Sequence, residues 1–199
     1  MTAIPIGRLL RANTTGCVMG CRLNQGSAPA FGDMIRIPLS DGKHIYGLVH
    51  EIHIDDDGLV RQLVSTEVSP EIIEDNRQNR NVPIEMSVVF IGWEDEQGRV
   101  YHTRVPYPPL TLDEIFPCDD EDILRFTHPG QPGYLRAILR NEELPAADLI
   151  TAHLKQVLAV DLHDRDGWRD RYINEVIALM KDDYPQLMDV LTAVSNVLQ

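Results

Sequence analysis

Hydrophobic and polar residues change their spacing about two thirds of the way along the chain. From Ile4 to about Phe126, the apolar residues form short alternating segments separated by turn residues. Such segments are typical of β-strands with one buried face. After residue 128, apolar residues recur every three or four positions, which is the spacing of amphipathic helices. The sequence therefore predicts an α+β protein with its strands first and its helices last.

Short strands are expected throughout the first part. The segments DMIRIPL and KHIYGLVHEIHI alternate apolar and polar residues on either side of Ser40, Asp41 and Gly42. Because Asp-Gly readily supplies positive φ angles, these three residues predict a β-hairpin with a two-residue turn. Further strands are expected at IPIGRLLRA, CVMGCRL, LVRQLVSTEVS, IEMSVVFIGWED and DEQGRVYHTRV. Several short strands at this spacing indicate a small antiparallel barrel or sandwich.

Two other segments interrupt the strand pattern. SPEIIEDNRQNRNVP carries a proline near each end and is predicted to be a long surface loop with one helical turn. In VPYPPLTLDEIF, the residues Pro106, Pro108 and Pro109 indicate an extended linker. Asp119 comes next and can cap a short helix, DDEDILRF, whose acidic first turn suits the helix dipole.

The last part predicts three to four amphipathic helices. Gly167 separates two of them, and Pro185 is expected to open the final one, because proline breaks a helix interior but fits the first turn. We therefore expect two domains, a small antiparallel β-barrel over residues 1–127 and a helical domain over residues 128–199. The apolar faces of these helices are interpreted as core, with a protein interface as the alternative.

Charge and targeting signals limit the possible partners. The formal net charge is −13, and the acidic residues are spread over the whole chain. This charge argues against general nucleic-acid binding, with a local patch at Arg77, Arg80 and Arg61 as the best exception. No leader sequence or membrane-spanning apolar segment is recognised, so we expect a cytoplasmic protein.

The three cysteines do not suggest a metal site or a disulfide framework. Cys17, Cys21 and Cys118 form an odd set without a CxxC pair, which fits reduced thiols. Cys17 and Cys21 lie in an apolar strand context and are interpreted as buried small hydrophobic residues. Nucleotide and hydrolase signatures are also missing, since the chain has no phosphate-binding loop, no GxGxxG and no GxSxG.

The histidines raise the question of a metal site. On a regular strand, His44 and His50 would share a face, but roughly 20 Å would separate them, too far for one metal ion. His53 and Asp55 share the same parity, yet two ligands do not make a site. A structural or surface role is therefore favoured for all four residues. A metal-dependent hydrolase that uses His50, His53 and Asp55 remains the alternative.

A second acidic cluster lies in the segment DLHDRDG, which contains Asp161, His163, Asp164 and Asp166. A calcium loop would need a glutamate near its twelfth position, where this chain has a tyrosine. The segment is interpreted instead as an interhelical loop that ends in an aspartate N-cap.

Several short motifs occur in an order that resembles a known barrel. An Ile-Gly-Arg strand opens the chain, Gly-Asp enters a later strand, the return strand of the hairpin carries a glycine before its Val and Ile, and a proline-rich exit follows. In this sequence the corresponding residues are Ile6, Gly7, Arg8, Gly32, Asp33, Gly47, Val49, Ile52, Pro106, Pro108, Pro109 and Ile115. Over roughly residues 4–127 the chain resembles the HAS barrel, the N-terminal barrel shared by HerA-type DNA-translocating ATPases and the rotary ATP synthases.

The resemblance implies the role of the barrel and not that of a motor. HerA-type proteins continue into a large ATPase domain with a phosphate loop, whereas this chain continues into a short helical region without one. What remains is the role of the barrel in packing neighbouring subunits and contacting accessory proteins.

The leading hypothesis is a non-enzymatic assembly or adaptor protein that acts through its barrel and helices. Its partner would be a second copy or another protein, with a HerA-like ATPase as one possibility. We predict no catalytic residues, no cofactor and no metal. The alternatives are the hydrolase described above and a single-strand nucleic-acid-binding barrel, which ranks last because only 6% of the residues are aromatic.

Overall fold

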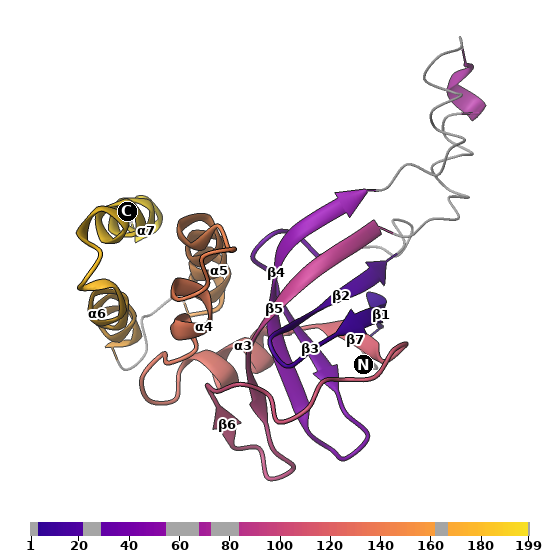
Figure 1. Ribbon diagram of the computed structural model, residues 1–199, viewed down its shortest axis with the longest axis horizontal. Helices are drawn as coiled ribbons and strands as arrows, with labels where there is room; N and C mark the ends of the chain where they lie inside the picture. Colours follow the sequence, from indigo (N-terminus) through magenta and orange to yellow (C-terminus); the bar gives the residue numbers. More distant parts are fainter. Residues whose placement is uncertain (1–3, 22–28, 55–67, 73–83, 162–166, 199) are drawn as a thin grey trace.

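The computed structural model describes residues 4–21, 29–54, 68–72, 84–161 and 167–198 of the chain. Its strands are β1 (Gly7–Ala12), β2 (Gly16–Cys21), β3 (Met34–Pro38), β4 (His44–Ile54), β5 (Ile84–Glu94), β6 (Val100–Tyr101) and β7 (Glu114–Pro117) (Figure 1). Its helices are α3 (Asp120–Thr127), α4 (Leu135–Leu139), α5 (Ala146–Val160), α6 (Trp168–Met180) and α7 (Tyr184–Leu198).

Six antiparallel strands close into a barrel. The strand order is β2-β1-β7-β3-β4-β5, and an additional pairing between β2 and β5 joins the two ends. The short β6 lies outside the closed barrel and pairs only with β5. The expected α+β class with a small antiparallel barrel is therefore confirmed.

Of the two longest strands, β5 buries both faces along most of its length, and β4 does so only over its first half, up to Val49. Ile45 and Val49 of β4 point into the barrel, whereas Tyr46 and Leu48 belong to a second core outside it. On β5, Val88 likewise belongs to the barrel interior, and its neighbours Val89 and Ile91 to the outer core. Burial on both faces explains why β5 and the first half of β4 are nearly continuous apolar sequences.

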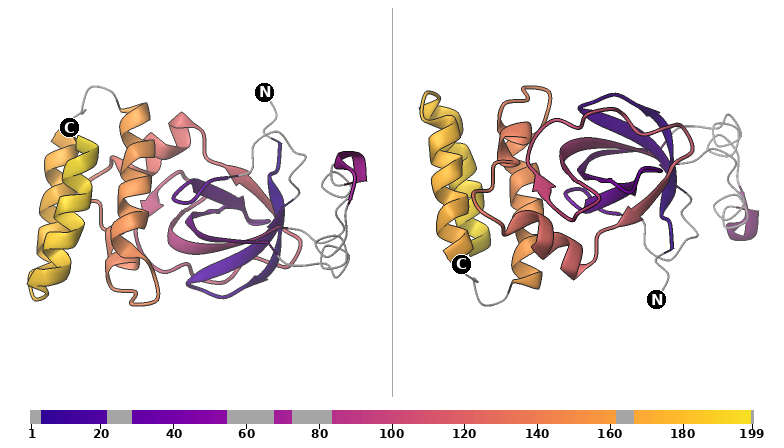
Figure 2. Two further views of the ribbon diagram at one scale, coloured as in Figure 1. Left: turned by 90° about the horizontal axis from the view of Figure 1, so that it is seen from above. Right: turned by 90° about the horizontal axis from the view of Figure 1, so that it is seen from below.

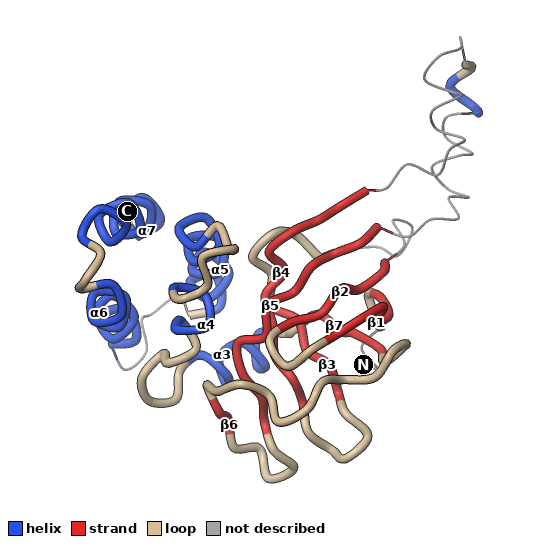
Figure 3. The backbone as a smooth tube through the Cα atoms, in the orientation of Figure 1, coloured by secondary structure: helices blue, strands red, loops and turns tan. Residues whose placement is uncertain are grey.

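The helices form layers on one side of the barrel. In Figure 2, α5 lies next to the barrel, and α6 and α7 form the outermost layer. Figure 3 shows the same separation of helices and strands. The outer core fills the space between them with side chains such as Phe126, Leu149, Leu154 and Trp168, all 0–1% exposed.

A glycine allows α5 to approach the barrel. Gly32 has φ 88°, and a Cβ atom there would lie 2.3 Å from the Cβ of Ala152 on α5. Any side chain at this position would therefore collide with the helix, in a backbone conformation that already disfavours one. The adjacent backbone also anchors α5, since the Met34 N–H donates to Oε1 of Gln156 at 3.0 Å.

A buried polar network fixes α3 against the barrel wall. The hydroxyl of Tyr46 donates to Oε2 of Glu94 at 2.6 Å and accepts from Arg125 of α3 at 3.2 Å. Nε of Arg36 lies 2.9 Å from Oδ2 of Asp122, also on α3. Tyr46, Glu94 and Arg125 satisfy one another through hydrogen bonds, and together with the Arg36–Asp122 ion pair they help to fix the position of α3 on the sheet.

The β3–β4 hairpin is one residue longer than predicted. The N–H of Leu39 donates to the carbonyl of Lys43 at 2.8 Å, so three residues form the loop instead of two. Gly42, the last of them, has φ 83°. The hydrogen bond and the positive φ angle identify a three-residue hairpin loop with glycine in the left-handed region. The position of the turn was therefore predicted correctly, but its predicted type was wrong.

Two further differences concern the segment between β5 and α3. The strand expected over DEQGRVYHTRV is reduced to Val100–Tyr101. Conversely, part of the expected linker is a barrel strand, because Glu114–Pro117 pairs with β1 on one side and β3 on the other. Without this short strand the barrel could not close.

The helix ends confirm two predictions and correct a third. Asp119 caps α3 and forms a reciprocal capping box with Asp122. Pro185 lies in the first turn of α7, as expected. The N-cap of α6 is Gly167, with φ 64° and no side-chain hydrogen bond, so the expected aspartate cap is wrong.

Some predictions fall outside the described residues. These include the strand expected at LVRQLVSTEVS, most of the polar loop that follows it, and the arginines Arg61, Arg77 and Arg80. Within the loop, the described residues 70–72 form the expected helical turn. None of the helices in the described part is long and apolar enough to cross a bilayer.

Candidate anion-binding cleft

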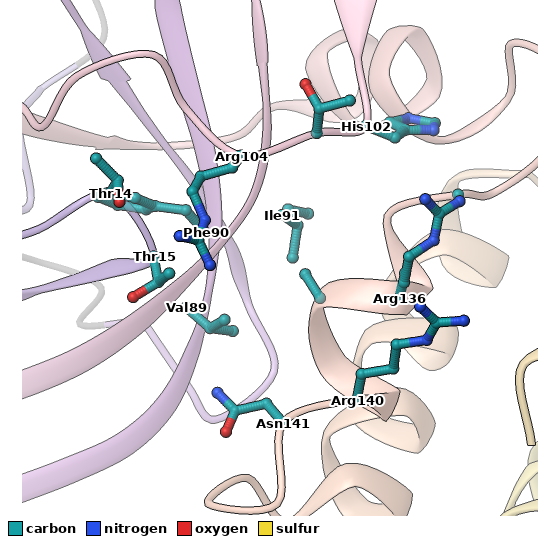
Figure 4. Close-up of a pocket in the computed structure, with 13 residues that line it drawn as sticks. Thr14, Thr15, Val89, Phe90, Ile91, His102, Arg104, Arg136, Arg140 and Asn141 are labelled. Carbon is teal, nitrogen blue, oxygen red and sulfur yellow. The ribbon is translucent and has the colours of Figure 1, made fainter.

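A cleft of about 480 Å³ lies where the barrel meets the helices. Figure 4 shows its walls, which come from the β1–β2 turn, β5, the segment after β6, and α4. The lining residues are Thr14, Thr15, Val89, Phe90, Ile91, His102, Thr103, Arg104, Gly133, Arg136, Ala137, Arg140 and Asn141.

Three arginines line this cleft. Arg104 lies beside Phe90 and Thr15, and Arg136 and Arg140 lie on the other side of the cleft (Figure 4). Among the described residues, none of the three arginines has an ion-pair or hydrogen-bond partner. Since the chain carries 13 more acidic than basic residues, three unneutralised arginines in one cleft are a marked local exception.

The β1–β2 turn forms a rigid wall. Oδ1 of Asn13 accepts hydrogen bonds from the backbone N–H groups of Thr15 and Gly16 and from the Thr15 hydroxyl, at 2.7–3.0 Å. The carbonyl of Thr15 accepts from the N–H of Phe90 at 2.8 Å, which ties the turn to β5. The hydroxyl of Thr14 has no partner among the described residues and is free to donate to a ligand.

The wall that carries Arg104 is held by packing around β6. The rings of Trp93 and Tyr101 stack with centroids 4.4 Å apart, and Trp93 Nε1 donates to Thr103 Oγ1 at 3.3 Å. Val105, immediately after Arg104, is 2% exposed. Fixed residues on both sides of Arg104 therefore orient its backbone at the cleft.

His102 is a neutral wall residue near Arg136. Its Nε2 lies 2.9 Å from the carbonyl of Phe126, so this nitrogen carries the proton and donates. Burial lowers the pKa of His102, and the nearby charge of Arg136 lowers it further, while the bond to the carbonyl opposes them. A neutral imidazole leaves the positive charge of the cleft to the arginines.

Helix α4 has one buried face and one face that lines the cleft. Leu135 and Ile138 are 0% exposed and belong to the outer core. Arg136 and Arg140 are four residues apart and therefore lie on one exposed face of α4 and its C-cap. Asn141 follows, and its amide oxygen accepts from the N–H of Glu143 at 3.1 Å, which leaves the amide nitrogen free to donate.

The cleft can bind an anion but carries no recognised catalytic arrangement. Its polar groups are three guanidinium groups, hydroxyls, an amide and one histidine, and its lining residues include no carboxylate, lysine or cysteine. Guanidinium groups match the geometry of carboxylates and phosphates and remain charged at any physiological pH.

The structure describes only part of the alternative site at His50, His53 and Asp55. The pairing of β4 with β5 skips His50, so this histidine lies in a bulge and simple alternation along β4 ends at Val49. Burial lowers the pKa of His44 and that of His50. His53 lies on the exposed end of β4, and Asp55 lies outside the described residues. The described part contains no group of three or more side chains that could hold a metal ion.

The other candidates are only partly described. Asp161 is 1% exposed, and its Oδ2 lies 3.0 Å from Nε2 of His128, while the rest of the DLHDRDG cluster lies outside the described residues. Cys17 and Cys21 are free and buried in the barrel interior. Burial raises the pKa of Cys17 to about 12 and also raises that of Cys21, so neither is a ready nucleophile.

The arginines of the cleft were not predicted from the sequence. Only the spacing of Arg136 and Arg140 in the short segment LRAILR could have signalled a shared face, and Arg104 is remote in sequence. No protein-family model matches this chain, and no curated protein matches it.

Proposed function

We propose that this chain is a non-enzymatic assembly or adaptor protein that acts through its barrel and helices. The exposed apolar side chains of the outermost helices carry this proposal. The cleft lined by Arg104, Arg136 and Arg140, called the arginine cleft below, is built jointly by barrel and helices and offers a separate binding surface. Resemblance to the HAS barrel adds support, since that barrel packs subunits and contacts accessory proteins.

The outermost helices support contact with another subunit. Large apolar side chains remain partly exposed there, with Ile177 at 41%, Tyr184 at 69% and Met188 at 42%. Tyr184 and Met188 are four residues apart on α7 and share a face. We propose a second copy of the chain as the occupant of this face, in keeping with the subunit packing that the resemblance implies.

Light scattering coupled to size-exclusion chromatography tests the proposal. Wild-type protein is expected to form an oligomer, and the double variant Tyr184→Gln/Met188→Gln is expected to shift it toward the monomer. The control Ser195→Gln/Asn196→Gln changes exposed polar residues of the same helix and should leave the mass unchanged. A wild-type protein that stays monomeric up to high micromolar concentration would contradict assembly through this face.

The two alternatives have direct tests of their own. A metal-dependent hydrolase at His50, His53 and Asp55 requires a stoichiometric transition metal, which elemental analysis of untagged protein would detect. A single-strand nucleic-acid module requires a salt-dependent shift of a labelled oligonucleotide at micromolar protein. We expect no oligonucleotide shift, because the net charge of −13 repels a polyanion. We also expect no stoichiometric metal, because the described residues contain no group of three or more possible ligands.

A further inference from the structure

We propose that the arginine cleft is a binding site for a small organic phosphate ester, with the phosphate group held by Arg136 and Arg140 on one wall and with Arg104 on the opposite wall adding to the positive charge of the cleft. The proposal goes beyond the proposed function, because binding of a small molecule does not require that the protein assembles.

The charge distribution points to an anionic ligand. Like charges four residues apart on a helix repel each other and destabilise it. Arg136 and Arg140 have this spacing, and Arg104 adds a third charge to the same cleft. No described acidic side chain neutralises any of them, in a chain with 31 acidic residues. A bound anion would supply the missing counter-charge.

The size of the cleft favours a small molecule over a polymer. Its volume of about 480 Å³ falls within the range of roughly 300–1,000 Å³ typical of small-molecule sites. A nucleic acid would extend beyond the cleft over a protein of net charge −13, where each further phosphate would be repelled. A small ester places its charge only at the arginines.

Apolar residues of the cleft would contact the organic part of the ester. Val89, Phe90 and Ile91 of β5 and Ala137 of α4 contribute to the lining. A ligand with one charged end and one apolar or weakly polar body therefore matches the cleft better than a free inorganic ion.

The donors suit a tetrahedral phosphate. Guanidinium groups form paired, charge-assisted hydrogen bonds with phosphate oxygens. The free Thr14 hydroxyl and the free amide nitrogen of Asn141 add neutral donors at the β1–β2 turn and at the end of α4. A phosphate monoester has three terminal acceptor oxygens and a charge near −2 at neutral pH.

Isothermal titration calorimetry with the full chain tests the proposal. The probes are inorganic phosphate, ribose 5-phosphate, adenosine monophosphate and, as a dicarboxylate, succinate. The variant Arg136→Ala/Arg140→Ala removes two cleft charges and keeps helix propensity, because alanine favours helices. The control Lys155→Ala/Lys181→Ala removes two exposed positive charges elsewhere on the helices.

We expect at least one of the two phosphate esters to bind more tightly than inorganic phosphate and succinate. Its affinity should fall at least tenfold in the arginine variant and less than threefold in the lysine control. It should also weaken below about pH 6, where the phosphate dianion takes up a proton and becomes a monoanion.

Three results would overturn the proposal. They are no heat of binding from either ester at millimolar concentration, equal losses in the arginine variant and the lysine control, and succinate binding as tightly as the esters. Circular dichroism and thermal unfolding establish that both variants are folded. Light scattering of the same samples tests assembly separately, so a failure of phosphate binding does not count against the proposed function.

Discussion

His153 on α5 should make the protein less stable in mild acid. Its side chain is 0% exposed, and its ring meets that of Tyr134 edge-on with centroids 5.6 Å apart. Within the described part of the chain, neither ring nitrogen has a hydrogen-bond partner at normal geometry. Burial lowers the pKa of His153 from 6.5 to about 4, and Gln156, one turn along α5, offsets only part of this shift.

The sign and size of the effect follow from proton linkage. Between pH 4 and 6.5, the unfolded chain binds a proton at this position while the folded chain does not. The free energy of unfolding therefore falls as the pH falls through this window. Each pKa unit corresponds to about 1.4 kcal/mol, so the full loss at pH 4 is about 3 kcal/mol, and about 2 kcal/mol is already lost near pH 5.

Urea unfolding followed by tryptophan fluorescence can measure this loss, because Trp168 is 0% exposed and lies in the same outer core. The matched variant is His153→Leu, which has a similar volume and no titrating group. Its free energy of unfolding should depend less on pH by about 2 kcal/mol between about pH 7.5 and pH 5. At about pH 7.5 it should be at least as stable as the wild type, since no buried nitrogen remains unpaired.

Comparing the two proteins removes the contribution of all other titrating groups. Burial also lowers the pKa values of His44, His50 and His102, so the wild type and the variant share these acid-sensitive terms. Parallel curves of unfolding free energy against pH for the two proteins would show that His153 does not titrate as the structure indicates, and would refute the reasoning.

Three further predictions concern stability and can use the same urea assay. Tyr46→Phe should lower the free energy of unfolding by about 1–3 kcal/mol, because its buried hydroxyl donates to Glu94. Tyr134→Phe should not lower it measurably, because its buried hydroxyl has no partner among the described residues, and equal losses in the two variants would contradict this. Asp119→Ala should lower the free energy of unfolding by about 1 kcal/mol because it removes the N-cap of α3, and Asp119→Asn should lower it much less because asparagine can also cap a helix. Gly92→Ala should destabilise the protein by at least 1 kcal/mol, because its Cβ would lie 2.4 Å from a backbone oxygen, and a neutral result would show that β5 can move there.

The strands that could be predicted from the sequence are those whose own apolar residues are arranged as in a strand. β5 and the first half of β4 bury both faces, and their many apolar residues are enough to predict a strand. β7 differs, because only Ile115 among its four residues is buried and prolines surround it in sequence. Its strand conformation comes from pairing with β1 and β3, which are distant in sequence. The strand propensity of these four residues does not reveal such pairing with distant strands.

The cleft could not be predicted from the sequence for a related reason. Arg104 follows β6, and Arg136 and Arg140 belong to α4, so their meeting depends on barrel closure and on the packing of α4 against β5. A net charge of −13 averages over the whole chain and therefore conceals a local excess of three positive charges. The composition still excludes a long polyanion, because its charge would extend beyond the cleft. It does not exclude a small anion, whose charge would lie within a few ångströms of the arginines, where the local field outweighs the screened average.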